Sequence, residues 1–273
     1  MLTAEDNELI SRIGPGTLMG GLLRQYWLPA LLSSEVVADG EPVRTLLLGE
    51  KLIAFRDTSG QIGLIQDHCP HRGASLFFGR NEEAGLRCVY HGWKFDVSGQ
   101  CVDMPNEPAE SSFKNKVRAL AYPCVERNGL VWAYLGPRPT PPPLPDLEAN
   151  MLPAGEWTVT AIQRECNWLQ ALEGDIDTSH AGLLHFGSIG EDDMPAGTFS
   201  HYLVRERAPR YSILGTEVGT MYGAYRSAAP GFEYWRLAHF MFPIYAIPPQ
   251  GLLGSKVVAF ARVPLDDEHT LTF

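Results

Sequence analysis

The sequence predicts an α+β protein in two parts: a small antiparallel β domain, then a domain that combines helix with further strands. Three observations carry this prediction. Short β-prone runs separated by turn residues fill residues 43–135, and a proline-rich stretch follows at residues 136–145. Beyond it, a helix-like segment at residues 167–186 precedes several strand-like runs. Such runs, bounded by turn residues, are typical of strands that pair with their sequence neighbours.

The N-terminal residues predict short helices ahead of the β domain. Thr3 and Asp6 resemble a helix capping box. Two glycines and a proline at residues 14–16 then break the chain before a second apolar segment at residues 18–27. We therefore expect an N-terminal helical segment over residues 1–42.

Turn signals set the organisation of the rest of the chain. Asp57–Gly60 separates two β-prone runs, and Asn128-Gly129 is a strong signal for a two-residue hairpin, so residues 43–135 form the first domain. Six of the ten residues in 136–145 are proline, which favours an extended linker. Residues 146–273 form the second domain. Its expected strands are the runs at residues 201–207, 220–226, 234–242 and 255–263.

The composition is that of a soluble globular protein, and its acidic net charge disfavours binding to polyanions. The 273 residues carry 32 acidic and 22 basic side chains, a formal net charge of −10. This charge repels nucleic-acid backbones and anionic membranes, so we expect neither as a partner. The first ten residues hold three acids and no Lys or Arg, the reverse of a secretory leader. Together with the odd count of five cysteines, this favours a reducing, cytoplasmic location.

Two segments supply a set of two cysteines and two histidines. Cys69 and His71 form a C-x-H pair, and after sixteen intervening residues Cys88 and His91 form a C-x2-H pair. Structural zinc sites accept such ligands but usually keep the two cysteines together and the two histidines together. A Rieske [2Fe–2S] cluster takes two thiolates on one iron and two imidazoles on the other. The interleaved order therefore favours a Rieske cluster over zinc.

A second constellation lies in the helix-like segment, with the pattern Asp177-x2-His180-x4-His185. Two histidines and a carboxylate make the facial triad of non-heme Fe(II) oxygenases. Five residues of regular helix place His180 and His185 about 140° apart, so they converge only if the helix is distorted. Gly182 lies between them, and we predict a π-helical bulge there, because such bulges gather at functional sites.

These motifs resemble those of Rieske non-heme iron aromatic ring-hydroxylating oxygenases, in particular the α subunits of the phthalate dioxygenase-like group. The matching segments are DHCPHRGASL and CVYHGWKFD for the cluster and D-x2-H-x4-H for the iron. The resemblance implies a helix-grip catalytic domain, in which an antiparallel sheet wraps around helices. Ala74 and Tyr90 stand where respiratory Rieske proteins carry disulfide-forming cysteines, so no disulfide is expected. The implied ligands are Cys69, His71, Cys88 and His91 for the [2Fe–2S] cluster, and His180 and His185 for mononuclear Fe(II).

The resemblance also implies an assembly and partners. Asp177 is not expected to be an iron ligand. It is expected to hydrogen-bond His180 and, in a head-to-tail homotrimer or stacked trimers, His91 of the neighbouring subunit. A carboxylate behind an imidazole fixes the tautomer and orientation of the ring. Electrons are expected from NAD(P)H through a separate reductase, because no GxGxxG fingerprint follows a strand in this sequence. The reaction combines these electrons with O2 and an aromatic substrate.

One element of the family pattern is missing. The third iron ligand in the family is an acid on a late helix, whereas the late acids here, Asp266, Asp267 and Glu268, occupy an ordinary turn. We therefore expect the 273 residues to hold an incomplete catalytic domain, with the third ligand outside them.

The substrate is the least determined feature. Arg205 and Arg207 alternate along an expected strand and are candidates to clamp an aromatic carboxylate, although a solvated sheet face explains them equally well. We expect hydroxylation of a carboxylated aromatic, as in phthalate-type dioxygenation in aromatic catabolism. A monooxygenase or O-demethylase that acts on a methoxyaromatic would have the same motifs, so it remains an alternative. Two further alternatives are a non-catalytic Rieske electron carrier and a zinc-stabilised binding module. The candidate pocket aromatics are Trp168, Phe186, Tyr202 and Phe240.

Overall fold

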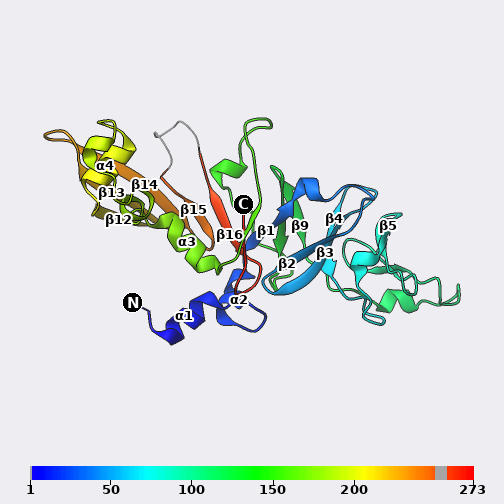
Figure 1. Ribbon diagram of the computed structural model, residues 1–273. Coiled ribbons are helices and arrows are strands. Elements are labelled where there is room, and N and C mark those ends of the chain that lie inside the picture. Colours follow the sequence, from blue (N-terminus) through cyan, green and yellow to red (C-terminus); the bar gives the residue numbers. More distant parts are fainter. Residues whose placement is uncertain (1, 250–256) are drawn as a thin grey trace. The chain divides into compact units, whose positions relative to one another are not determined.

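The chain forms two compact units in a computed structural model that describes residues 2–249 and 257–273. The first unit comprises residues 1–168 and 263–273, and the second comprises residues 169–262. The chain passes from the first unit to the second at the start of helix α3 (Trp168–Ile176) and returns within strand β16 (Phe260–Pro264) (Figure 1).

The first unit is rich in β structure, and its paired strands are antiparallel. Two short helices precede the sheets, α1 (Ala4–Ser11) and α2 (Leu18–Leu23). One sheet has the order β2-β3-β4, a second β5-β6-β7-β8, a third β1-β10-β9, and β11 pairs with β17. The strands are β1 (Trp27–Leu32), β2 (Val43–Leu47), β3 (Glu50–Arg56), β4 (Ile62–Gln66), β5 (Arg80–Glu82), β6 (Gly85–Arg87), β7 (Lys94–Phe95), β8 (Cys101–Asp103), β9 (Cys124–Arg127), β10 (Leu130–Tyr134), β11 (Ile162–Arg164) and β17 (Thr270–Thr272).

The turns read from the sequence form as predicted. Between β3 and β4, Asp57 Oδ1 accepts hydrogen bonds from the N–H groups of Ser59 and Gln61, each at 2.9 Å. Between β9 and β10, Asn128 and Gly129 both have positive φ, 47° and 77°. A two-residue hairpin turn of this kind needs positive φ at both positions, which Asn and Gly tolerate best. The predicted turn at Asp57–Gly60 and the predicted hairpin at Asn128-Gly129 are both confirmed.

A single apolar cluster holds together the β2-β3-β4 and β5-β6-β7-β8 sheets. Both cysteines of the predicted cluster site belong to it, with 3% of each exposed. Trp93 also belongs to this cluster, with 5% exposed. The site loops are thus anchored by their own cysteines in the packed interior. The remaining members of the cluster are Ile53, Phe55, Ile65, Leu76, Leu86, Phe95, Cys101, Met104 and Ala119.

The second unit is an antiparallel sheet with helical segments. The sheet order is β16-β15-β14-β13-β12, and the register pairs Tyr222 with Ala238 and Arg226 with Tyr234. Helix α4 contacts β13, as Figure 1 shows. The elements are α3, the π-helical turn η5 (Ala181–His185), the 3-10 turn η6 (Glu191–Asp193), α4 (Phe199–Arg205), β12 (Arg210–Thr216), β13 (Gly219–Ser227), β14 (Glu233–Met241), β15 (Tyr245–Ile247) and β16.

The α+β prediction is confirmed, with mostly antiparallel sheets and few helices, but three local expectations differ. The N-terminal region is not helical throughout, because β1 begins at Trp27 and pairs with β10. The run at residues 201–207 was expected as a strand, yet it contains the end of helix α4, whose N-cap Thr198 accepts from the N–H of His201. Part of the expected strand at residues 255–263 lies outside the described residues, and β16 begins at Phe260.

The proline-rich stretch forms no helix or strand, but the two units divide further along the chain, after Trp168. Residues 146–168, which follow the proline-rich stretch, belong to the first unit because hydrogen bonds connect them to the β9–β10 hairpin. Arg127 Nε donates to Asn150 Oδ1 at 2.8 Å, and Asn128 Nδ2 donates to the Leu152 carbonyl at 2.8 Å.

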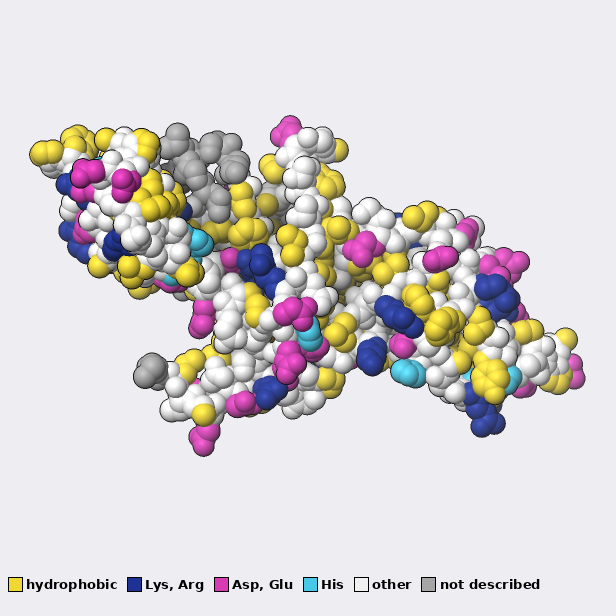
Figure 2. All heavy atoms as spheres, in the orientation of Figure 1, with side chains coloured by type: hydrophobic (Ala, Val, Ile, Leu, Met, Phe, Trp, Pro, Cys, Tyr) yellow, Lys and Arg dark blue, Asp and Glu magenta, His cyan; other side chains and the backbone are white. Residues whose placement is uncertain are grey.

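Acidic and basic side chains are interspersed on the face in Figure 2. Among the described residues, no helix combines the length and the apolar character needed to cross a bilayer.

Candidate functional site

The first predicted site is built on two loops that close in the same way. In the loop after β4, the N–H of Cys69 donates to the Ala74 carbonyl at 2.8 Å, and the N–H of Gly73 donates to the Cys69 carbonyl at 2.9 Å. Gly73 has φ +72°, a conformation that favours glycine. The loop therefore turns back on itself within six residues and keeps its cysteine at its base.

The loop after β6 repeats this pattern. The N–H of Cys88 donates to the Trp93 carbonyl at 2.9 Å, and the N–H of Gly92 donates to the Cys88 carbonyl at 3.0 Å. Gly92 also has positive φ, +76°, and a Cβ there would lie 2.5 Å from the side chain of Pro105. Both loops thus place Cys at position 1 and Gly at position 5, so the two Cys-His pairs are presented by equivalent backbones.

The two cysteines lie together in the interior. All five cysteines of the chain are free. Burial raises the pKa of Cys69 to about 11, although the N–H of His71 acts in the opposite direction, and neighbouring Cys88 raises it further. Two thiols packed side by side cannot both ionise without a positive counter-charge. A metal centre supplies that charge, so this pair suits a thiolate-bound iron.

The two histidines of these loops also face each other. The ring centroids of His71 and His91 are 4.5 Å apart, and His71 stacks on Trp93 at 4.3 Å. His71 Nδ1 is buried and has no hydrogen-bond partner in the part of the chain that the structure describes. Burial, then the nearby His91 and Arg72, lower the pKa of His71, which keeps its ring neutral. A buried, neutral imidazole nitrogen without a partner is suited to bind a metal, and two cysteines with two histidines match the ligand set of a Rieske cluster.

The second predicted site lies on a distorted helical turn. The predicted π-helical bulge is confirmed, spanning Ala181–His185 with Gly182 buried inside it. The Nε2 atoms of His180 and His185 lie 3.2 Å apart. Imidazole ligands about 2.1 Å from one ion at right angles have nitrogens about 3 Å apart, so the separation fits two adjacent positions on a metal.

Asp177 lies behind His180, on the side away from His185. Its Oδ2 is 3.0 Å from His180 Nδ1, and its Oδ1 accepts from the N–H and the hydroxyl of Ser179, each at 2.8 Å. Partial burial opposes ionisation, but the bonds from Ser179 and His180 outweigh it, so the pKa of Asp177 lies below its ordinary value. An ionised carboxylate at Nδ1 holds the proton there and leaves Nε2 free to bind a metal.

Two tyrosines from the sheet contact the same segment, and the sequence carried no signal for either. Tyr211 Oη and Ser179 Oγ are 2.9 Å apart, and the Tyr222 hydroxyl donates to the Ile176 carbonyl. Tyr211 is on β12 and Tyr222 on β13, so their approach depends on the fold of the sheet.

The structure does not place Arg205 and Arg207 on one strand face. Arg205 ends helix α4, and Arg207 follows the helix. Arg207 Nη1 donates to the carbonyls of Gly182 and Gly187, and its Nη2 donates to the Ile189 carbonyl at 3.0 Å. Its guanidinium therefore holds the backbone around the π-helical turn. The strand expectation failed because Thr198 caps a helix start three residues ahead of the alternating pattern.

Among the described residues, no group of three or more His, Cys, Asp or Glu side chains is arranged to hold one ion. Both predicted sites offer two protein ligands per iron, and Asp177 is placed on the far side of His180. Asp266, one of the late acids, belongs to the first unit, where it accepts from the N–H groups of Glu268 and His269.

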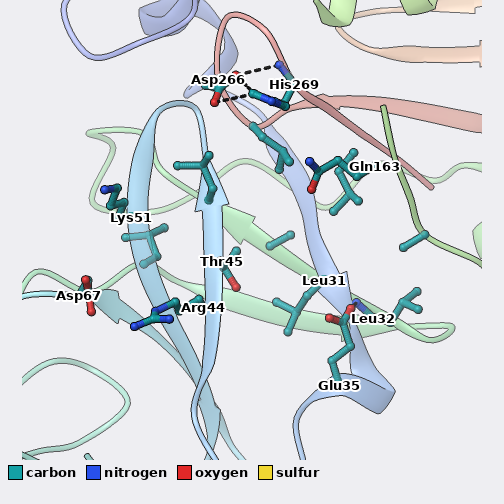
Figure 3. A pocket seen from close by; sticks show the side chains of 16 residues that line it. Leu31, Leu32, Glu35, Arg44, Thr45, Lys51, Asp67, Gln163, Asp266 and His269 are labelled. Carbon is teal, nitrogen blue, oxygen red and sulfur yellow. Dashed lines mark hydrogen bonds and ion pairs between the residues drawn. The ribbon is translucent and has the colours of Figure 1, made fainter. Parts of the chain in front are cut away.

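A cavity of about 840 Å³ opens in the first unit, away from the predicted ligands. Strands β1, β2 and β3 form one side, and residues 265–271 the other (Figure 3). His269 points toward Asp266, with Nδ1 2.8 Å from Oδ1, so these two polar groups are already paired. The side chains that line the cavity include none from the Cys-His loops or from the π-helical turn.

Two protein families match the chain. The Rieske [2Fe-2S] domain family matches residues 26–122, and the LigXa C-terminal domain-like family matches residues 133–273. Among solved structures, dicamba monooxygenase bound to 3,6-dichlorosalicylic acid superimposes with a TM-score of 0.69 at 21% identity, over 92% of this chain and 76% of that one. The terminal oxygenase of carbazole 1,9a-dioxygenase from Novosphingobium sp. KA1 superimposes with a TM-score of 0.62 at 23% identity, over 91% and 72%. At these identities the likeness shows the fold.

Curated relatives are closer in sequence. The 3-chlorobenzoate-3,4-dioxygenase oxygenase subunit of Comamonas testosteroni is 51% identical over 273 residues, all of this chain and 63% of that protein. The phthalate 4,5-dioxygenase oxygenase subunit of Pseudomonas putida is 41% identical over 286 positions, 99% of this chain and 63% of that protein. The chain thus spans under two thirds of the length of these relatives. With both family matches in place, the chain belongs to the Rieske non-heme iron oxygenases, whose cofactors are a [2Fe–2S] cluster and a mononuclear iron.

Proposed function

We propose that this protein is the oxygenase component of a multicomponent Rieske system that hydroxylates an aromatic carboxylate. In this proposal Cys69, Cys88, His71 and His91 hold the cluster, and His180 and His185 bind the iron. The observation that carries it is the 3.2 Å approach of the two Nε2 atoms on a π-helical turn, with a carboxylate behind one ring. The family's iron supplies O2 activation when it is bound.

The chain's own residues perform the positioning. Asp177 holds the proton of His180 at Nδ1, so Nε2 keeps its lone pair. Arg207 secures the backbone on both sides of His185 through the carbonyls of Gly182 and Gly187. Such preorganisation matters because a catalytic group displaced by about 1 Å loses much of its rate advantage.

The partners we propose follow from the family and the residues. A separate NAD(P)H-dependent reductase reduces the cluster. In a homotrimer, Asp177 of one subunit connects His180 to His91 of its neighbour, which shortens the path between the two metal centres. The exposed fraction of the Asp177 side chain, 43%, leaves room for such a contact. The odd count of five cysteines, all of them free, supports a reducing, cytoplasmic location.

The substrate class rests on the relatives. The relatives that are 51% and 41% identical are named for 3-chlorobenzoate and phthalate, both aromatic carboxylates. A second candidate reaction is O-demethylation, which is supported by 44% identity over 189 residues to the 5,5'-dehydrodivanillate O-demethylase oxygenase subunit of Sphingobium sp.. Both reactions use the same two metal centres.

Oxygen uptake by the purified protein, with a Rieske reductase and NADH, tests this function. We expect uptake with 3-chlorobenzoate and incorporation of 18O from 18O2 into the product. Formaldehyde release from a methoxybenzoate, without ring hydroxylation, would assign the demethylase reaction instead. His185→Ala is the matched control: it should keep the visible spectrum of the cluster and lose substrate-dependent uptake. If the cluster of the unaltered protein is reduced but no oxygen is consumed, the protein is an electron carrier and not an oxygenase.

A further inference from the structure

The segment that carries Asp177 is tied to the sheet of the second unit by two tyrosine hydroxyls. Tyr222 on β13 donates to the carbonyl of Ile176, the last residue of helix α3. Tyr211 Oη on β12 lies 2.9 Å from Ser179 Oγ. The carboxylate behind the proposed iron histidine therefore lies between two points at which the chain is attached to the sheet.

The two tyrosines share one face of this sheet. In the register of β12 and β13, Ile213 pairs with Tyr222. Tyr211 lies two residues before Ile213, and residues two apart on a strand point to the same face. The two tyrosine rings meet edge to face, with centroids 5.8 Å apart. Each ring therefore restricts the movement of the other, which keeps both hydroxyls in place.

Tyr222 is a permanent donor at the end of α3. The last carbonyls of a helix have no partner within the helix, and the Tyr222 hydroxyl supplies one at Ile176. Burial, followed by the electrostatic effects of Tyr211 and Asp177, raises the pKa of Tyr222 to about 12. The hydroxyl therefore keeps its proton at neutral pH and holds the end of the helix.

The hydrogen bonds between Tyr211 and His180 have a fixed direction. Ser179 Oγ donates to Asp177 Oδ1 at 2.8 Å, and this bond uses the only proton of the serine hydroxyl. Tyr211 is then the donor in its 2.9 Å contact with Ser179 Oγ. On the other side of the carboxylate, Asp177 Oδ2 lies 3.0 Å from His180 Nδ1. A continuous chain of hydrogen bonds thus runs from Tyr211 to His180.

The two oxygens of Asp177 have separate partners. Oδ1 accepts from the N–H and the hydroxyl of Ser179, whereas Oδ2 accepts from the N–H of His180 at 3.2 Å and faces Nδ1 of its ring. A rotation of the carboxylate would break bonds on both sides. A hydroxyl that accepts a hydrogen bond becomes a stronger donor in turn, so Tyr211 strengthens the bond from Ser179 to the carboxylate.

We propose that Tyr211 is a positioning residue for the oxygenase reaction: by donating to Ser179, it orients the Asp177 carboxylate and, through it, the His180 ring. This inference rests on the proposed function, in which Asp177 and His180 serve the iron. Tyr222 supports the same segment by fixing the end of α3. This role requires no contact between Tyr211 and the substrate, so loss of the Tyr211 hydroxyl should affect turnover and not substrate binding.

Two measurements on the intact protein test this role: the EPR spectrum of the iron(II)–nitric oxide complex, and cluster reoxidation in single turnover with 3-chlorobenzoate and O2. Tyr211→Phe removes the hydroxyl and keeps the ring. It should change the rhombicity of the nitric oxide signal, slow reoxidation about two- to fivefold, and leave KM for 3-chlorobenzoate unchanged. The slowing should be smaller than in Asp177→Asn, because two hydrogen-bonded groups separate Tyr211 from His180.

A double-mutant cycle separates this role from a merely structural one. If Tyr211 acts through Ser179, Tyr211→Phe should have no further effect on either measurement in a Ser179→Ala background. Tyr225→Phe is the matched control, because Tyr225 lies on the opposite face of β13, where it stacks on Trp235 with centroids 4.4 Å apart. This control should match the unaltered protein in both measurements.

The outcomes distinguish this inference from the proposed function. If Tyr211→Phe matches the unaltered protein while Asp177→Asn is slow, this inference alone is overturned. Additive effects of Tyr211→Phe and Ser179→Ala would also overturn it, since Tyr211 would then not act through Ser179. Fast reoxidation in Asp177→Asn would remove the role of Asp177 and this inference with it. No nitric oxide signal from the unaltered protein would refute the iron site at His180 and His185.

Discussion

The Nε2 atoms of His180 and His185 lie 3.2 Å apart although a regular helix would turn them away from each other. The extra residue of the π-helical turn Ala181–His185 provides the missing rotation. Gly182 makes this turn possible, because it is buried and its Cα lies close to the neighbouring helix. A Cβ at this position would lie 3.2 Å from the Leu203 carbonyl and 3.5 Å from Arg207.

We therefore expect Gly182→Ala to displace the turn and reduce iron binding. The crowding should cost about 1–2 kcal/mol of unfolding free energy. Iron beyond that of the cluster should fall, as measured by metal analysis, while the cluster absorbance stays unchanged. Gly174→Ala is the matched control in α3, since a Cβ there meets nothing within 4 Å. It should stabilise the protein by about 0.5–1 kcal/mol, and equal iron content in the two variants would contradict this account.

Arg207 should be required for the order of the same turn. Its guanidinium donates to the carbonyls of Gly182, Gly187 and Ile189. In Arg207→Ala these acceptors lose a charged donor, which should destabilise the segment by about 1–3 kcal/mol. Hydrogen exchange at residues 182–189 should speed up, and it should not in Arg205→Ala, whose Nη1 makes one 3.4 Å bond to the Ala228 carbonyl. Unchanged exchange in both variants would show that Arg207 does not hold the turn.

Local signals in the sequence predicted much of this molecule. The spacing of Cys69, His71, Cys88 and His91 predicted two loops, and glycine at the fifth position of each loop is what lets them close alike. The distortion between His180 and His185 followed from helix geometry, from the need for both rings to reach one metal, and from Gly182 between them. These features depend on residues within one segment, where sequence rules apply directly.

Long-range features were beyond such rules. In the sequence, Arg226 looks like an ordinary exposed charge in a strand. Its burial becomes visible only when β13 pairs with β14 and helix α4 packs on the sheet. Arg207 likewise gave no sign that it reaches back to Gly182, 25 residues earlier. The strand expected at residues 201–207 failed because the cap at Thr198 and packing of Leu203 and Val204 favoured a helix.

His91→Cys should keep an iron–sulfur centre and lower its reduction potential. A thiolate adds negative charge where a neutral imidazole stood, and Rieske centres lie at roughly −150 to +300 mV against about −400 mV for plant-type ferredoxins. Redox titration followed by EPR measures the midpoint. A midpoint that does not move would exclude His91 as a ligand, and Tyr90→Phe, beside it, should leave the value nearly unchanged.

Asp177→Asn should leave both metals bound but slow electron transfer between them. The amide cannot accept from both Ser179 and His180 as the carboxylate does, so the tautomer of His180 is no longer fixed. In single turnover with substrate and O2, cluster reoxidation should slow by at least about tenfold. Ser179→Ala removes one bond to the same carboxylate and should slow it far less. Fast reoxidation in Asp177→Asn would disprove the bridging role.

The second cluster loop should be sensitive to acid through Arg87. Its Nη1 donates to the Gly92 carbonyl at 2.7 Å and to Asp103 at 2.7 Å, and its Nε pairs with Glu82 at 2.6 Å. Hydrogen bonds from Arg80 and Arg87 lower the pKa of Glu82, and the bond from Arg87 lowers that of Asp103. Arg87 thus depends on two ionised carboxylates to stay aimed at the loop.

The sign of the pH effect follows from these lowered pKa values. The stability contributed by Glu82 and Asp103 is complete above their ordinary pKa values of 4.5 and 3.8, and it is lost as the pH falls through the lower values of the folded protein. Cluster absorbance should therefore persist to about pH 4 and bleach below it. In Arg87→Met the protein should be less stable at pH 7, because the Gly92 carbonyl loses its donor. Its unfolding free energy should also change less between pH 6 and pH 3.5, and an identical change in both proteins would mean that these carboxylates act through another group.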